Sequence, residues 1–102
     1  MNGQPPREVE LPPGLEVVRA TKVFDSVTVP HGLLRSHELA PEVWARLVVD
    51  SGSVVFVFED APTSPRRLHA GEHQIVPPAR GHRISPGDDA SFYLEFLRAT
   101  EE

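Results

Sequence analysis

The sequence contains no cysteine, which excludes disulfide bridges, thiol nucleophiles and the cysteine-rich type of zinc site. It also lacks any run approaching the roughly 20 apolar residues that a membrane-spanning helix needs, so we expect no membrane span. A small domain without disulfides must close its own hydrophobic core or dimerise. A homodimer is therefore one expectation.

Basic residues are also few. The chain has ten Lys and Arg residues against fifteen Asp and Glu, which gives a formal net charge of −5. Because nucleic-acid binding needs a basic face, this balance argues against it. Residues 1–10 are polar and acidic and have no apolar segment of the kind found in a signal peptide. The default expectation is a cytoplasmic protein.

The length of 102 residues allows one domain with one hydrophobic core. We predict a flexible N-terminal arm over residues 1–10 and a single domain over residues 11–102. Eleven prolines and seven glycines make the chain turn often, which favours short strands over long helices.

Apolar runs between these turns predict about eight short strands. The clearest alternation is in residues 91–98, where Phe92 and Phe96 share one face and Tyr93 and Glu95 share the other. The turn residues 50–53 lie between two β-branched runs and predict a hairpin. The other strands are expected at residues 15–20, 32–37, 43–49, 54–58, 66–69, 73–76 and 82–85. The pattern predicts an all-β sandwich or barrel.

Two of the five histidines occupy positions that would hold a side chain in a fixed place. His82 opens a strand directly after the rigid Pro77–Gly81 turn, and His37 ends an apolar segment just before a loop. Imidazole is the commonest metal ligand in proteins. His37 and His82 are therefore candidate ligands.

Glu95 is the third candidate. It lies between Leu94 and Phe96 in a strongly apolar strand, where a carboxylate without a partner is costly. The partner can be a metal, an arginine, or water at the mouth of a barrel, and the sequence leaves these alternatives open.

Several motifs carry a resemblance to a known family. Gly71, Pro77 and His82 have the spacing of the second cupin motif, which is Gly, five residues, Pro, four residues, His. The wider pattern from Leu11 to Arg98 is similar to the TehB/YeaR-like cupin family, a group of RmlC-like cupins. The segments that carry this similarity are residues 11–15, 28–37, 43–47 with Gly52, 77–82 and 92–96.

This resemblance implies a small single-domain cupin-type β-barrel, that is, a double-stranded β-helix or jelly roll, of the kind that usually holds one divalent metal. The family is linked by name to tellurite resistance and stress response. The site residues that the resemblance implies, together with those singled out above, are the metal ligands His37, His82 and Glu95 and the ligand pocket Trp44, Arg46 and Tyr93.

The chain departs from ordinary cupins in the first motif, which usually holds two histidines one residue apart and then a glutamate. Only His37 is present there, so we expect few protein ligands and several waters. Two imidazoles and a carboxylate would suit zinc, iron, nickel or manganese. Arg80 and Arg83 flank His82 and would favour an oxyanion, although pairing with surface carboxylates is the alternative.

Three functions stay open. The favoured one is a metal-binding cupin that binds a small anionic ligand or oxyanion in a stress or tellurite-resistance context. The second is a metal-dependent cupin enzyme, such as an oxygenase, isomerase or hydrolase, which the lack of a distinct acid/base pair argues against. The third is a metal-free structural or regulatory module that acts as a homodimer or with a partner.

Overall fold

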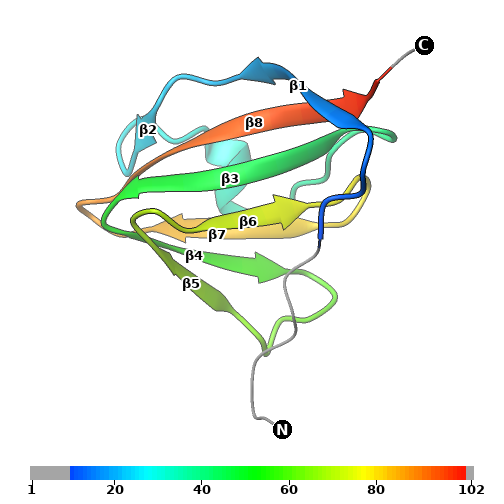
Figure 1. Ribbon diagram of the computed structural model, residues 1–102. Coiled ribbons are helices and arrows are strands. Elements are labelled where there is room, and N and C mark those ends of the chain that lie inside the picture. The colour runs from blue at the N-terminus through cyan, green and yellow to red at the C-terminus, as the bar shows by residue number, and fades with distance from the viewer. Residues whose placement is uncertain (1–9, 101–102) are drawn as a thin grey trace, which may run out of the picture.

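The computed structural model describes residues 10–100 and confirms an all-β domain (Figure 1). The described part contains eight strands and one short 3-10 helix. These elements are β1 (Leu15–Ala20), β2 (Phe24–Asp25), η1 (His31–Leu34), β3 (Trp44–Ser51), β4 (Ser53–Phe58), β5 (Arg66–His69), β6 (His73–Val76), β7 (His82–Pro86) and β8 (Ser91–Ala99). No helix among these residues is long and apolar enough to cross a membrane.

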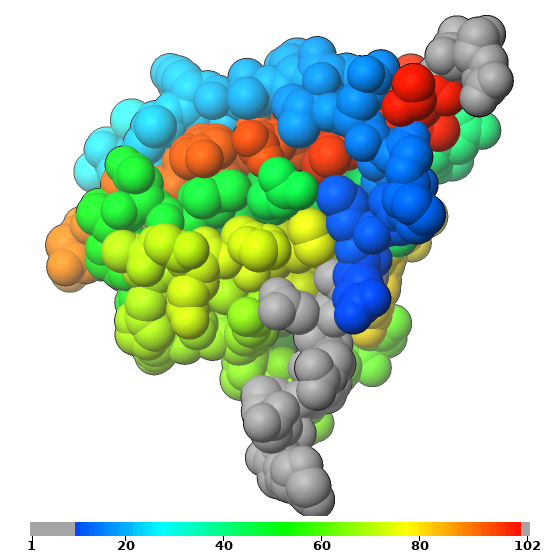
Figure 2. Space-filling view, viewed as in Figure 1, coloured from blue at the N-terminus to red at the C-terminus, as the bar shows by residue number. Residues whose placement is uncertain are grey.

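The strands form two antiparallel sheets. The five-stranded sheet has the order β1-β8-β3-β6, with β2 also paired to β8, and the three-stranded sheet has the order β5-β4-β7. Figure 2 shows the outer face of the larger sheet, where β1, β8, β3 and β6 follow one another down the molecule. Helix η1 lies behind this sheet in Figure 1.

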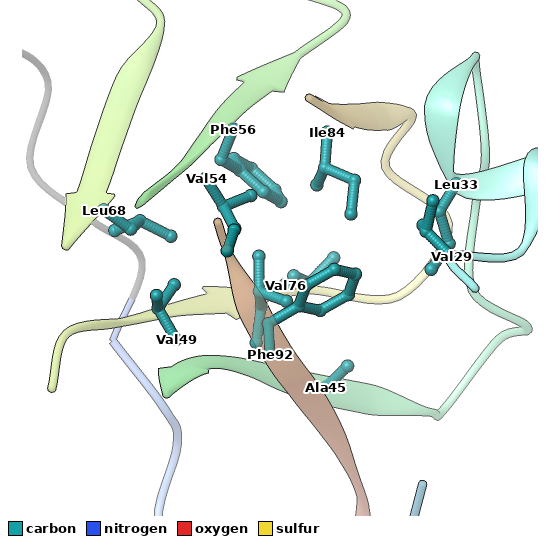
Figure 3. Packing of buried hydrophobic residues seen from close by; sticks show 12 residues of the cluster. Val29, Leu33, Ala45, Val49, Val54, Phe56, Leu68, Val76, Ile84 and Phe92 are labelled. Atoms are coloured by element: carbon teal, nitrogen blue, oxygen red, sulfur yellow. The ribbon is translucent and has the colours of Figure 1, made fainter. Parts of the chain in front are cut away.

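The hydrophobic core fills the space between the sheets. Figure 3 shows Phe56 and Ile84 of the smaller sheet facing Val76 and Phe92 of the larger one. Phe92 is fully buried and Phe56 is almost so, because the strands alternate with a period of two and turn one set of apolar side chains inward. The predicted alternation in residues 91–98 is confirmed for Phe92.

The predicted hairpin at residues 50–53 is wrong. β3 pairs with β6 and β8, whereas β4 pairs with β5 and β7, so the chain crosses from one sheet to the other at this turn. Gly52 makes the corner possible, since it has a φ of +65° and lies against Asp89 and Ala90. The turn residues were read correctly, but turn chemistry alone does not say which strands pair.

The predicted strand at residues 32–37 is also wrong. The segment begins with η1, in which the Leu33 amide donates to the Pro30 carbonyl at 3.0 Å. Leu33 is buried and Leu34 is exposed. One turn of helix therefore places Leu33 over the core, beside Val29 in Figure 3, and His37 follows as a single bridge residue.

Candidate functional site

A cavity of about 330 Å³ lies where η1 and residues 37–39 cover the inner face of the five-stranded sheet. This volume falls in the range of small-molecule sites, which are typically ~300–1,000 Å³ and mostly apolar. Its walls are apolar almost throughout. The larger apolar side chains that line it are Phe24, Leu33, Leu39, Val76, Leu94 and Phe96.

One row of residues crosses the sheet to form the floor of the cavity. Arg19 of β1 pairs with Phe96 of β8, Phe96 pairs with Ala45 of β3, and Ala45 pairs with Val76 of β6. Directly paired residues share a face, so all four side chains belong to the inner face. All four line the cavity. Arg19 stands on the edge strand and is exposed, which places it at the rim.

The Arg19 guanidinium lies over the Phe96 ring, 4.9 Å from its centroid. No carboxylate in residues 10–100 forms an ion pair with it. Arg19 was missed from the sequence because β1 carries no periodic signal there. Only the long-range register with Phe96 reveals that this arginine faces the cavity.

The structure brings His37 and His82 together in the wall of the cavity. Their backbones exchange two hydrogen bonds of 2.9 Å each as an antiparallel bridge. Their rings lie edge to face with centroids 5.3 Å apart. His82 also stacks on Phe56, with centroids 5.5 Å apart and the rings 15° from parallel. These contacts hold the His82 ring in one orientation.

Burial lowers the pKa of the His82 imidazole below its usual value of 6.5, and the nearby His37 lowers it further. The hydrogen bond to the Arg80 carbonyl acts in the opposite direction, and so does the charge of Glu59. His82 is 4% exposed, so the dominant cause is the loss of hydration of the charged form. His82 is therefore neutral near pH 7.

The Nδ1 atom of His82 lies 3.1 Å from the Arg80 carbonyl oxygen. A carbonyl oxygen can only accept, so Nδ1 carries the proton and Nε2 of the neutral ring is left as an acceptor. This orientation by a carbonyl is the kind that metal-ligating histidines have.

The structure does not bring Glu95 to the two histidines. Its carboxylate Oε1 accepts a hydrogen bond of 2.7 Å from Nη1 of Arg46. Glu95 alternates along β8 with Leu94 and Phe96, which line the cavity, and Arg46 alternates along β3 with Ala45, which also lines it. The Arg46–Glu95 pair therefore lies on the outer face of the sheet. Of the partners that the sequence left open for Glu95, the structure shows the arginine.

Trp44 and Tyr93 share that outer face, because they alternate with Ala45, Leu94 and Phe92. Trp44 lines a separate hollow of about 340 Å³ together with Leu15, Glu42, Arg98 and the residues that follow Arg98. The residues predicted to form a ligand pocket, namely Trp44, Arg46 and Tyr93, are therefore on the side of the sheet opposite to the histidine pair.

The arginines that flank His82 in sequence are paired with surface carboxylates. Arg80 donates from Nε and Nη2 to the Asp60 carboxylate at 2.9–3.2 Å, which lowers the pKa of Asp60. Arg83 Nη1 donates to Glu59 Oε2 at 2.7 Å. Neither arginine lines the cavity. Surface pairing, the alternative that the sequence left open, is what the structure shows.

The donor set falls short of a complete metal site. Zinc sites in proteins use three or four protein ligands, and the carboxylates of Glu95, Glu59 and Asp60 all have arginine partners. No group of three or more His, Cys, Asp or Glu side chains in residues 10–100 is arranged to hold a metal. Only His37 and His82 come together, so these residues alone do not fit a resident metal ion.

Residues 19–94 match the TehB-like domain family. The matched span begins at Arg19 and includes both histidines of the cavity. No match was found among curated proteins.

Solved structures show the same fold. A protein from E. coli strain K12 is 26% identical, with a TM-score of 0.83 over 91% of this chain and 99% of that chain. TehB from Haemophilus influenzae is 21% identical, with a TM-score of 0.78 over 85% of this chain, which spans only 32% of TehB. A cupin-2 domain protein from Shewanella frigidimarina is 16% identical, with a TM-score of 0.54 over 98% of this chain and 83% of that chain.

Proposed function

Because this chain belongs to the TehB-like domain family, we propose that it is a ligand-binding cupin domain that takes a small organic anion into the cavity between its sheets. The observation that carries the proposal is Arg19, a cation without an acidic partner in residues 10–100, at the rim of an apolar cavity. The chain as a whole is acidic, so this local positive charge is not a consequence of composition.

The cavity walls define the body of the ligand. Phe24, Leu94 and Phe96 give the cavity an apolar lining, and none of its lining residues is acidic. Burying apolar ligand surface there contributes about 25 cal/mol per Å². A guanidinium at the rim adds a charge-assisted hydrogen bond to a carboxylate.

This chemistry favours an organic anion over a bare oxyanion such as tellurite. A compact oxyanion would lose its water shell among apolar side chains and gain one guanidinium, which is an unfavourable exchange. An aromatic carboxylate can leave its charged group at the hydrated rim beside Arg19. The family resemblance implies a context of tellurite resistance or stress. We expect the ligand to be present under those conditions.

A second candidate is metal binding at His37 and His82. It is favoured by one observation, the Arg80 carbonyl that orients the His82 ring as in metal sites. A zinc, iron, nickel or manganese ion there would need further donors from water or from the bound anion. A metal-dependent oxygenase, isomerase or hydrolase finds less support, since no carboxylate lines the cavity beside the two histidines to complete an acid/base pair.

The experiment measures benzoate binding by isothermal titration calorimetry. We expect benzoate to bind the wild-type protein and to bind Arg19→Gln about tenfold more weakly, as for the loss of one charged hydrogen bond. Arg67→Gln is the matched control, because Arg67 is exposed on β5 and does not line the cavity. The proposal fails if benzoate does not bind, or if the two variants weaken binding equally.

The cytoplasmic location and the homodimer belong to the same proposal as expectations. Sedimentation equilibrium of the purified protein measures its oligomeric state directly.

A further inference from the structure

His82 has a nitrogen atom without a partner. Its Nδ1 is engaged by the Arg80 carbonyl, and no residue of the described chain forms a hydrogen bond with Nε2. Covering this acceptor completely without a partner would cost about 1–3 kcal/mol. A ligand that covers it therefore has to offer a hydrogen-bond donor.

Nε2 keeps some solvent-accessible surface. Among the buried and half-buried described residues, every side-chain nitrogen or oxygen either has a hydrogen-bond partner or keeps some solvent-accessible surface. Nε2 lacks a partner, so it keeps some accessible surface although the residue is only 4% exposed. His82 lines the cavity, so a ligand in the cavity lies against this ring.

We infer that the cavity selects organic anions that also carry a hydroxyl group, which donates a hydrogen bond to His82 Nε2 at the inner side while the anionic group meets Arg19 at the rim. The inference rests on the proposed function and adds the class of ligand, a hydroxylated carboxylate with an apolar body. Arg19 is exposed and His82 is buried, so the two polar contacts differ in depth and together fix the direction in which the ligand enters.

Selectivity for the hydroxyl follows from the surroundings of Nε2. Phe56 covers one part of the His82 ring by stacking, and the His37 ring meets it edge to face. A ligand without a donor would displace water from Nε2 and return nothing. A site built to bond a hydroxyl rejects an analogue that lacks it, because the protein's polar atom is then left unpaired.

The experiment compares ligands of nearly equal size. We measure binding of 3-hydroxybenzoate and 4-hydroxybenzoate against 3-fluorobenzoate and 4-fluorobenzoate, at a pH where every carboxyl is ionised. For at least one of the two pairs, wild-type protein is expected to prefer the hydroxyl compound about tenfold. Equal binding of both members in both pairs would overturn the inference while leaving the proposed function intact, whereas no binding of any probe would remove both.

Two substitutions of His82 test the roles of Nδ1 and Nε2 separately. His82→Asn keeps an amide donor for the Arg80 carbonyl but has no atom at the place of Nε2, and it should abolish the preference. His82→Gln can place an acceptor near the position of Nε2 and should restore part of the preference for the hydroxyl compound. His69→Asn is the control, since His69 is exposed on β5 and should leave the preference unchanged.

An NMR measurement on the wild-type protein avoids any variant that does not fold. The ¹⁵N signal of His82 Nε2 should move toward that of a hydrogen-bonded acceptor on addition of the hydroxybenzoate, and less on addition of the matched fluorobenzoate. Equal shifts with both ligands would contradict the inference. A signal of metal-coordinated Nε2 in the protein as purified would also contradict it, because the acceptor would then be occupied.

Discussion

His37 and His82 are held together twice, by a pair of 2.9 Å backbone hydrogen bonds and by an edge-to-face contact of their rings at 5.3 Å. His37 comes from the segment after η1, and His82 begins β7. The backbone bridge fixes the main chain of both residues, and the His82 ring is held further by its stack on Phe56 and its hydrogen bond to the Arg80 carbonyl. The pair therefore places two imidazoles side by side in a mostly apolar wall.

Stability should fall when His82 is protonated. Its pKa is lowered in the folded protein from 6.5, so the unfolded chain binds more protons as the pH falls below 6.5. The stability that neutral His82 provides is present above pH 6.5 and is lost as the pH falls toward the lowered pKa, with a slope of at most about 1.4 kcal/mol per pH unit.

Urea unfolding of the wild type and His82→Gln from pH 8 to pH 5 measures this effect. The variant lacks the titrating ring, so its curve should be flatter over this range. Parallel curves for the two proteins would show that His82 does not cause the loss.

Removing the charge of Glu95 should have little effect on stability or on ligand binding. The Arg46–Glu95 pair lies on the outer face, with the two side chains 30% and 23% exposed, and partly exposed ion pairs typically contribute about 0–1 kcal/mol. We expect Glu95→Gln to lower the free energy of unfolding by less than about 1 kcal/mol and to leave benzoate binding unchanged. A large loss of ligand or metal binding in this variant would instead place Glu95 in the site.

The sequence predicted the strands better than their pairing. The strands at residues 66–69 and 73–76 have the predicted bounds, because turns with glycine or proline enclose them. The pairing of β3 with β8 instead of β4 depends on contacts between residues 40 to 53 positions apart in the chain, which no local pattern encodes. For the same reason the pairing of Arg19 with Phe96 could not be predicted.

The candidate site was predicted in part. His37 and His82 do meet, and the rigid turn before His82 was the useful signal. The side on which Glu95 lies could have been derived from alternation, since the large aromatic residues Phe92 and Phe96 mark the inner face. Leu97 obscured this, because it is an apolar residue that is buried on the outer face with Glu95.

Gly52 should be the glycine least tolerant of substitution. A Cβ at this position would lie 2.7 Å from Asp89 Oδ1 and 2.8 Å from the Ala90 Cα and the Asp89 carbonyl oxygen, and φ is +65°. Gly52→Ala should therefore lower the free energy of unfolding by about 2–4 kcal/mol through strain and overlap together.

Gly71→Ala is the matched control for Gly52→Ala. Gly71 has a φ of +89° with no atom within 4 Å of the added Cβ, so only backbone strain remains. It should cost about 1–2 kcal/mol. Thermal unfolding of both variants measures the difference, and equal losses would show that the corner between the sheets is not tightly packed.

Metal binding by His37 and His82 should be weak. Complete zinc sites in small proteins reach binding free energies of ~10–16 kcal/mol with four ligands, and this site offers two imidazoles and no carboxylate. Protein purified without a metal-affinity tag should contain well under one equivalent of zinc, iron, nickel or manganese by mass spectrometry of the elements. Stoichiometric metal that is lost in His37→Ala and kept in His69→Ala would contradict this prediction. It would mean that water or a bound anion completes the site, since the described carboxylates nearest to His82 in register, those of Glu59 and Asp60 after β4, are already paired with arginines.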